Sequence, residues 1–169
     1  MLITKMEEYG VRLVMRMARE GGQLSVTQLA EMERLPETTV AKVLLELRKA
    51  GVVRAERGRR GGYALADAPS RISMARVLQA LGEPLFSGRF CQAELEADCP
   101  NDAACGLRSV WAHIDRMIGR VLAGTTVEDL LAREDAVDRH VRTLWPLETP
   151  AGGGNVPGPV AAGGDEVVP

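Results

Sequence analysis

The feature that most constrains the fold is a change of hydrophobic period near residue 52. Before it, the stretch ETTVAKVLLELRKAG at residues 37–51 places valines and leucines three and four positions apart, which is the spacing of one helix face, and Gly51 is its expected end. After it, the stretch VVRAERGRRGGYAL contains two short segments typical of strands, 52–56 and 63–65, joined by a turn of glycine and arginine. The chain is therefore predicted to combine helices with one small two-stranded sheet.

Two further helices are predicted upstream from their start signals. Thr4 is followed three positions later by Glu7, and Ser25 is followed by Gln28 at the same spacing. Each pair matches a capping box, in which the two side chains satisfy backbone N–H groups at the start of a helix. The second helix is separated from the third, which begins at residue 37, only by a short link at Leu35 and Pro36.

Two modest helices joined by a tight link and followed by strand, turn and strand make a winged helix-turn-helix. We therefore predict a mainly α protein whose residues 1–82 form a winged helix-turn-helix domain that binds DNA, with a two-stranded wing. Residues 83–106 are predicted to form a cysteine loop, and residues 149–169 a disordered tail rich in glycine and proline.

A long apolar stripe follows the cysteine loop, within residues 107–148. Its spacing of threes and fours persists for over four turns, which suits a long helix packed against a partner helix in a homodimer. The alternative is a helix lying on its own domain. A capping box at Thr125 and Glu128 predicts a shorter terminal helix. The residues predicted at the dimer interface are Val110, Trp111, Ile114, Met117, Ile118 and Val121.

The charges are distributed unevenly along the chain. Residues 1–90 carry 15 Lys and Arg against 10 Asp and Glu, whereas residues 91–169 carry 6 against 13. The basic first part is where a polyanion such as DNA would bind. No run of about eighteen apolar residues predicts a membrane span, and the first residues lack the order of a secretory signal, so we expect a cytoplasmic location.

Two groups of side chains are candidates for DNA contact. On the helix that begins at residue 37, residues off the apolar stripe near its start can reach phosphates and base edges in a major groove. The arginines of the wing turn can approach the backbone or a narrow minor groove. Taken singly, each of these residues also fits an ordinary solvated surface. The candidates are Thr38, Thr39 and Lys42 on the helix, and Arg57, Arg59 and Arg60 on the wing.

All three cysteines lie in one segment, CQAELEADCPNDAAC, as Cys91, Cys99 and Cys105. An odd number in a reducing compartment disfavours structural disulfides. Thiolates are the usual ligands of iron–sulfur clusters, which take four ligands, so three cysteines leave one position to fill. Structural zinc sites usually bring paired cysteines two to four residues apart, and the gaps of seven and five residues here are wider. A cluster is favoured over zinc; redox-sensing free thiols and three cysteines without a joint role are the alternatives.

Several segments together resemble the Rrf-two family of transcription regulators, which includes IscR and NsrR. The resemblance rests on TKMEEYGVRLVMRMA at the start, LRKAGVVRAERGRRGGYAL in the wing, the three-cysteine loop and TTVEDLL after the long helix, and it spans residues 1–133. It implies a homodimeric winged-helix regulator with the long helix at the dimer interface. In many members, three cysteines bind an iron–sulfur cluster whose state controls the affinity for DNA.

The resemblance also bears on the fourth cluster ligand. IscR-like members have a first gap of five residues and a ligating histidine three positions after the last cysteine, whereas this chain has a longer gap and Arg108. His113 lies five positions further on, within the apolar stripe, and is interpreted as an interface or core residue. NsrR-like members use an acidic residue early in the first helix of the other subunit, and Glu8 matches that position. An acid there also stabilises the helix dipole without any metal.

The sequence thus predicts a DNA-binding repressor that binds a double-stranded operator as a homodimer. A cluster of the 2Fe-2S or 4Fe-4S type would sense nitric oxide, redox state or cluster supply. A second hypothesis is a regulator without a cluster that acts through thiol chemistry or a protein partner. A third is a cluster carrier or electron-transfer protein. An enzyme is not favoured, because the sequence shows no Ser/His/Asp set and no phosphate loop and has only two histidines.

Overall fold

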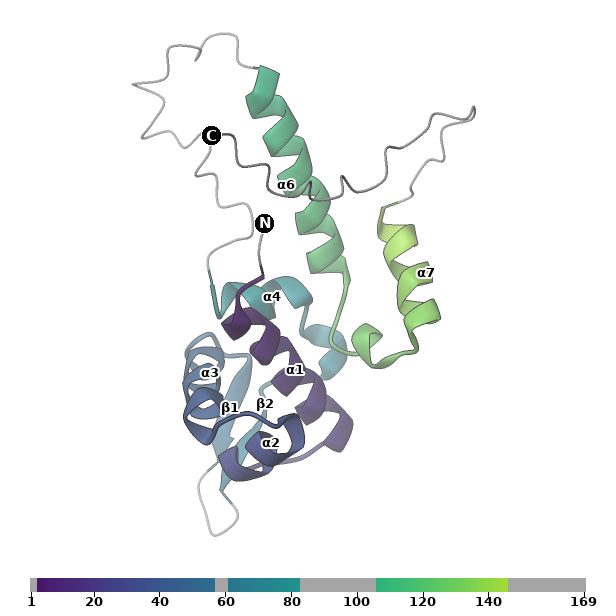
Figure 1. Cartoon of the computed structure of the whole chain (residues 1–169). Helices are drawn as coiled ribbons and strands as arrows, with labels where there is room; N and C mark the ends of the chain where they lie inside the picture. The colour runs from purple at the N-terminus through teal and green to yellow at the C-terminus, as the bar shows by residue number, and fades with distance from the viewer. Residues whose placement is uncertain (1–2, 57–60, 83–105, 146–169) are drawn as a thin grey trace, which may run out of the picture.

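The computed structural model describes residues 3–56, 61–82 and 106–145, which are coloured in Figure 1. The tip of the wing, the cysteine segment and the predicted tail lie outside these residues. The elements in chain order are α1 (Lys5–Glu20), α2 (Val26–Glu33), α3 (Glu37–Lys49), β1 (Val53–Glu56), β2 (Gly62–Leu65), η1 (Pro69–Arg71), α4 (Met74–Gln79), α6 (Gly106–Gly124), η3 (Asp129–Leu131) and α7 (Glu134–Leu144).

The first three helices and the sheet pack around one hydrophobic core. The apolar faces expected from periodicity are the buried ones, because each helix exposes its polar face to water. The capping boxes predicted at Thr4 and Ser25 are present, and Gly21 ends α1 with a φ of 67° that a side chain would disfavour. The buried core residues include Leu13, Val14, Met17, Leu29, Val40, Val43, Leu44, Leu47, Val52, Ile72 and Val77.

The wing is an antiparallel hairpin in which Val53 pairs with Leu65 and Glu56 with Gly62. Its second strand is also tied to the segment before α2. Tyr63 donates its backbone N–H to the Leu24 carbonyl at 2.8 Å and accepts the Leu24 N–H at 2.9 Å. Strand β2 therefore makes backbone hydrogen bonds along both of its edges. The predicted winged helix-turn-helix, with a two-stranded wing in a mainly α chain, is confirmed.

Just after α4, the side chain of Leu81 packs closely against a glycine of α1. A Cβ added to the buried Gly10 would lie 1.9 Å from Cδ1 of Leu81, well inside van der Waals contact. Ser73 caps α4, as its side chain accepts the Arg76 N–H at 3.3 Å. The close approach fixes the end of α4, which leads toward residue 83, relative to α1.

The chain returns to the core after α6. Val127 is 1% exposed, and the Met74 N–H donates to the Thr125 carbonyl at 2.8 Å. The predicted capping box at Thr125 and Glu128 is wrong by one residue. Thr126 and Asp129 form the reciprocal pair instead, with the Asp129 N–H 3.2 Å from the Thr126 Oγ1 and the Thr126 N–H 2.8 Å from Asp129 Oδ2.

The physical reason for this shift is tertiary. The Thr125 side chain is turned into the structure and donates its hydroxyl to the Val121 carbonyl at 2.8 Å, so it is not free to cap the next element. The Thr126–Asp129 pair closes the turn that leads into the short η3, and it lies well before the final helix. Helix α7 begins after Arg133, which makes no side-chain capping bond.

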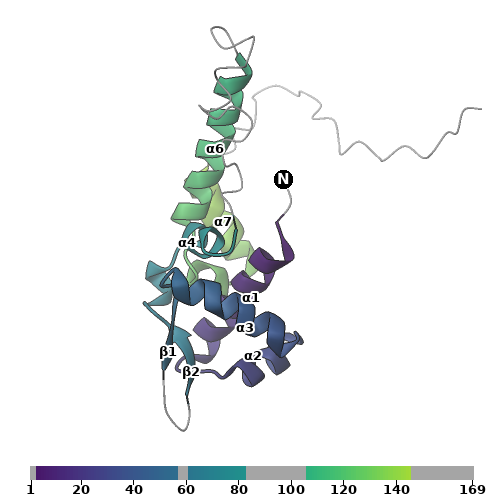
Figure 2. The same cartoon turned by 90° about the vertical axis from the view of Figure 1, so that its left-hand side faces the viewer.

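Helix α6 rises away from the winged-helix domain, and α7 stands beside it (Figures 1 and 2). None of the α6 residues whose exposure is described is fully buried. The stripe predicted for a dimer interface is therefore uncovered or half-covered within one chain. No helix within the described residues is long and apolar enough to cross a membrane.

Candidate nucleic-acid interface and cofactor ligands

Helix α3 lies along one face of the winged-helix domain, nearest the viewer in Figure 2. Its apolar stripe faces the core, so the opposite face is left to solvent. Thr38 and Lys42 are exposed and Thr39 is half-buried. The structure brings these three predicted contact residues together in the first half of the helix. They can offer two hydroxyls and one ammonium group to a polyanion.

The start of α3 is set by the turn that precedes it. Arg34 ends α2 in the left-handed region with a φ of 54°, which few non-glycine residues adopt. The Pro36 carbonyl then accepts the N–H groups of Thr39 at 2.9 Å and Val40 at 3.1 Å. Pro36 suits this position because its fixed φ matches the geometry of a helix entry. The turn therefore aims the first residues of α3 outward.

A charged clamp holds α1 against the end of α2. Glu33 is 9% exposed, and it accepts the Nε of Arg12 at 3.1 Å and the Nε of Arg16 at 2.8 Å. A second Arg12 nitrogen donates to the Glu33 backbone carbonyl at 2.8 Å. The hydrogen bond to Glu33 and its negative charge raise the pKa of Arg16 above its usual value. The residue after Glu33 is Arg34, so the clamp holds the turn between α2 and α3 against α1.

Sequence reasoning did not find this clamp. Its contacts span 17 and 21 residues, which no local pattern encodes. One signal was present: Glu33 is an acid in the last turn of α2, where the helix dipole disfavours negative charge. An acid in that place needs cationic partners, and α1 supplies two.

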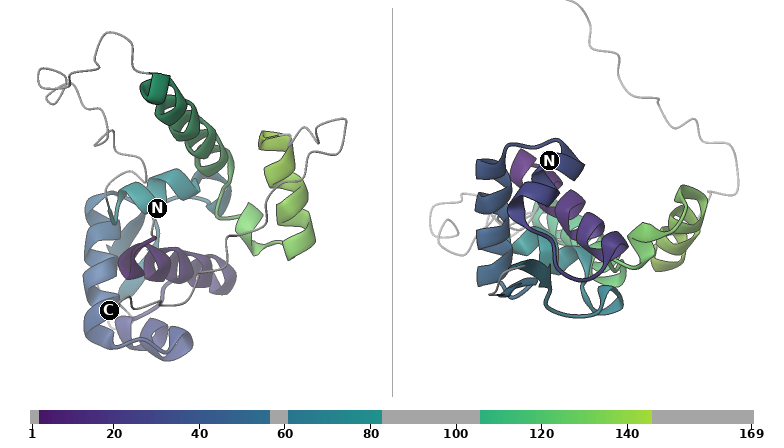
Figure 3. Two further views of the ribbon diagram at one scale, coloured as in Figure 1. Left: turned by 45° about the horizontal axis from the view of Figure 1, so that its top comes forward. Right: turned by 90° about the horizontal axis from the view of Figure 1, so that it is seen from below.

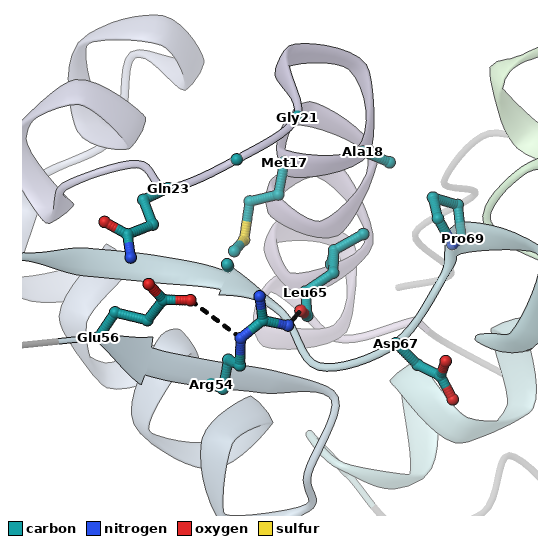
Figure 4. A pocket seen from close by; sticks show the side chains of 11 residues that line it. Met17, Ala18, Gly21, Gln23, Arg54, Glu56, Leu65, Asp67 and Pro69 are labelled. Carbon is teal, nitrogen blue, oxygen red and sulfur yellow. Dashed lines mark hydrogen bonds and ion pairs between the residues drawn. The ribbon is translucent and has the colours of Figure 1, made fainter.

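The wing arginines Arg57, Arg59 and Arg60 lie outside the described residues. At the base of the wing, an open hollow of about 500 Å³ lies between the end of α1 and the sheet (Figure 4). Its charged walls are already paired: Arg54 binds Glu56 at 3.0 Å, and Asp67 binds Arg71 at 2.9 Å. These ion pairs leave the hollow without an evident ligand-binding charge.

Glu8, the candidate fourth ligand, stands on the surface of α1. Its side chain is 57% exposed and lies 3.5 Å from Arg12, in an ion pair of the i, i+4 type. The neighbouring Glu7 is 3% exposed and is held by the capping box with Thr4, as predicted. The two adjacent acids therefore have different roles, because only Glu8 presents its carboxylate to solvent.

The three cysteines, Cys91, Cys99 and Cys105, fall outside the described part of the chain, as does the side chain of Arg108. Within residues 3–56, 61–82 and 106–145, no three His, Cys, Asp or Glu side chains come together as a metal site. The prediction that Cys91, Cys99, Cys105 and Glu8 hold a cluster therefore stays a prediction. The position of Glu8 on an exposed face is compatible with it.

The stripe on α6 is partly covered by α7. Val110 is 51% exposed, whereas Trp111, Ile114, Met117, Ile118 and Val121 are half-buried. An apolar groove of about 300 Å³ runs between the two helices. His113 is exposed and is not a core residue of this chain; its ring meets Trp145 edge-on, with centroids 6.0 Å apart. Seen from below, α7 lies well apart from α3 (Figure 3).

Comparison with known proteins gives a consistent result. The family model for Rrf2, described as an iron-dependent transcriptional regulator, matches residues 3–133. NsrR of Streptomyces coelicolor, a transcriptional repressor of the helix-turn-helix type, is 34% identical over 78% of this chain and 89% of its own. CymR, the global cysteine regulator of B. subtilis, superposes with a TM-score of 0.62 and 27% identity over 78% of this chain and 96% of its own. T. potens IscR superposes with a TM-score of 0.60 and 28% identity over 82% of this chain and 90% of its own.

Proposed function

Because this chain belongs to the Rrf2 family of transcriptional regulators, we propose that it is a homodimeric repressor whose affinity for DNA is set by an iron–sulfur cluster. The family consists of regulators and not of enzymes. The outward face of α3, with Thr38 and Lys42 exposed at its start, is the observation that carries the DNA-binding part of this proposal.

A helix with its side chains is about 10–12 Å wide, and the major groove of B-DNA is about 12 Å wide. In the view of Figure 2, no other described helix or strand lies in front of α3. The N-terminal end of α3 enters the groove, so that Thr38, Thr39 and Lys42 meet phosphates and base edges. The wing arginines Arg57, Arg59 and Arg60 then follow the flanking backbone.

The uncovered stripe of α6 supports dimerisation. Val110 at 51% and Leu107 at 55% are among the most exposed large apolar side chains in the described residues. Burial of such a stripe against the same helix of a second chain removes apolar area from water. A two-fold dimer also presents two copies of α3 to a palindromic operator.

The donor set supports a cluster. Three thiolates of one loop, at Cys91, Cys99 and Cys105, leave one position for a further ligand. Glu8 takes no part in the capping box, which uses Glu7, and it lies on the surface of α1. A cluster of the 2Fe-2S or 4Fe-4S type would supply a centre that reacts with nitric oxide or oxidants. Glu8 from the partner subunit would tie the loop of one chain to the first helix of the other.

Two measurements test this proposal. Anaerobic reconstitution with iron and sulfide should give visible absorption together with bound iron and acid-labile sulfide, and Cys99→Ala should lose most of each. A colourless wild type would reject the cluster and favour regulation by thiol chemistry. Fluorescence anisotropy with DNA from the chain's own promoter should give specific binding that weakens steeply with salt.

The matched pair Lys42→Ala and Arg139→Ala sharpens the second measurement, because each removes one exposed positive charge. Lys42 lies on α3, and Arg139 lies on α7, away from α3. Lys42→Ala should reduce the slope of log affinity against log salt by about one per contacted phosphate, and Arg139→Ala should not. Equal behaviour of the two variants would reject the docking of α3. If the promoter DNA is not bound in a salt-dependent way, a carrier protein is favoured instead.

A further inference from the structure

Leu45 is a large apolar residue in the middle of the outward face of α3. Its side chain is 38% exposed, in a helix whose other leucines, Leu44 and Leu47, are fully buried. With about 100° of rotation per residue, an arc of about 100° holds Thr38, Ala41, Lys42 and Leu45. Leu45 is therefore not the edge of the core stripe, because it stands opposite to that stripe.

An isolated exposed leucine is ordinary on a protein surface. Here, however, it is joined by Ala41, which is exposed and lies one turn earlier on the same face. The two residues form an apolar strip, defined as Ala41 and Leu45, flanked by Thr38 and Lys42. This strip occupies the face that the proposed function directs into the major groove.

The chemistry of base edges limits what such a strip can recognise. In the major groove, guanine, adenine and cytosine present hydrogen-bonding groups, and thymine alone also presents a methyl group. Helix α3, with the sequence ETTVAKVLLELRK, has no Asn or Gln for bidentate reading of adenine, and its single arginine, Arg48, lies in the last turn. The first three turns therefore offer the hydroxyls of Thr38 and Thr39, one ammonium group at Lys42 and the apolar strip.

The spacing and the charges agree with that use. Ala41 and Leu45 are about 6 Å apart along the helix axis, close to two base-pair steps of about 3.4 Å each. Lys42 and Arg48 are exposed beside the strip, and Lys49 is paired with Glu46 at 2.9 Å. The positive charges can contact phosphates while the strip faces the bases.

We propose that Ala41 and Leu45 select thymine in each half of the operator through contact with its C5 methyl group. This inference rests on the proposed function, since it requires α3 to enter the major groove. It goes beyond that function because it assigns the residues that determine sequence preference and the base that they prefer.

Deoxyuridine tests the inference directly, because it differs from thymine in the major groove only by the missing methyl group. A bound duplex is first selected from a random library with the full-length protein. Each thymine of that duplex is then replaced singly by deoxyuridine, and affinities are measured by fluorescence anisotropy. At one or two thymines per half-site, the wild type should lose affinity about four-fold, as expected for one buried methyl group.

The variant Leu45→Ala should bind the thymine duplex more weakly and lose its sensitivity to deoxyuridine at one of these positions. Leu45→Met, which keeps an apolar side chain of similar volume, should retain it. Lys42→Ala is the matched control and should weaken both duplexes equally. Circular dichroism verifies that each variant is folded, which the exposure of Leu45 leads us to expect.

Three results would overturn the inference alone. If wild-type binding is insensitive to deoxyuridine at every thymine, the protein makes no contact with a thymine methyl group. Equal sensitivity in Leu45→Ala and wild type assigns the contact to another residue. A dimer that dissociates in Leu45→Ala shows that the strip contacts protein instead of DNA. If the wild type selects no duplex at all, the proposed function fails and this inference fails with it.

Discussion

The Nε of Arg12 lies 3.1 Å from Oε2 of Glu33, and this contact joins α1 to the last residue of α2. The same guanidinium lies 3.5 Å from Glu8. One side chain therefore connects the candidate cluster ligand to the turn that aims α3. Only the side chains of Arg12 and Glu33 lie between Glu8 and that turn in this chain of contacts.

Substitution of Glu33 by alanine should destabilise the winged-helix domain by about 2 kcal/mol, because two guanidinium groups lose a mostly buried partner. Urea denaturation followed by circular dichroism measures the change. Glu31→Ala is the control, since Glu31 is exposed on the same helix. Equal stability of the two variants would show that the clamp adds nothing beyond an ordinary surface charge.

Gly10→Ala should destabilise the fold by about 1–3 kcal/mol, because the new methyl group overlaps Leu81 and forces α1 and α4 apart. The control is Gly119→Ala on α6, where an added Cβ meets nothing within 4 Å. That change should raise stability by up to about 1 kcal/mol through helix propensity. Thermal unfolding of both variants measures the contrast, and a loss in Gly119→Ala as large as that in Gly10→Ala would contradict the packing described here.

Asp129 should contribute to stability in a pH-dependent way. The Thr126 hydroxyl donates to it at 2.6 Å and the Thr126 N–H at 2.8 Å, and these bonds hold the pKa of Asp129 below its usual range. A depressed folded pKa means that the contribution is present above the unfolded pKa of about 3.9 and is lost as the pH falls through the folded value.

The variant Asp129→Asn should therefore be less stable than the wild type at pH 5, and the difference should shrink as the pH falls toward 3. Urea denaturation at each pH measures the two free energies of unfolding. A difference that stays constant over this range would mean that the ionised carboxylate of Asp129 is not what Thr126 stabilises.

Ile114→Glu should convert the dimer to a monomer, because it places a charge in the apolar stripe of α6. Light scattering coupled to size-exclusion chromatography should give the mass of two 18.2 kDa chains for the wild type and of one chain for the variant. Ala112→Glu, on the exposed opposite side of α6, should remain dimeric. Two monomeric variants, or two dimeric ones, would place the dimer interface elsewhere.

Much of the fold could be predicted because its signals are local. The boxes at Thr4 and Ser25 and the spacing of Val40, Val43 and Leu47 involve residues within one or two turns of each other. At Thr125 and Thr126 the local signal is ambiguous, because each threonine has an acid three positions later. Tertiary contacts decide between them, since the buried Thr125 hydroxyl binds the Val121 carbonyl.

The candidate site was predictable only in part for the same reason. The outward position of Thr38 and Lys42 follows from helix periodicity, and their exposure agrees with it. The clamp of Glu33 with Arg12 and Arg16 depends on how α1 crosses α2, and that crossing is fixed by the core. The cysteines and the wing arginines remain predictions from the sequence.

The most direct measurement is the DNA affinity of one reconstituted sample before and after its iron and acid-labile sulfide are removed anaerobically, with Cys99→Ala titrated beside it. Removal should change the affinity for DNA by at least about ten-fold, or about 1.4 kcal/mol. Cys99→Ala should behave like the stripped wild type throughout. The same affinity in all three samples would contradict control of DNA binding by a cluster.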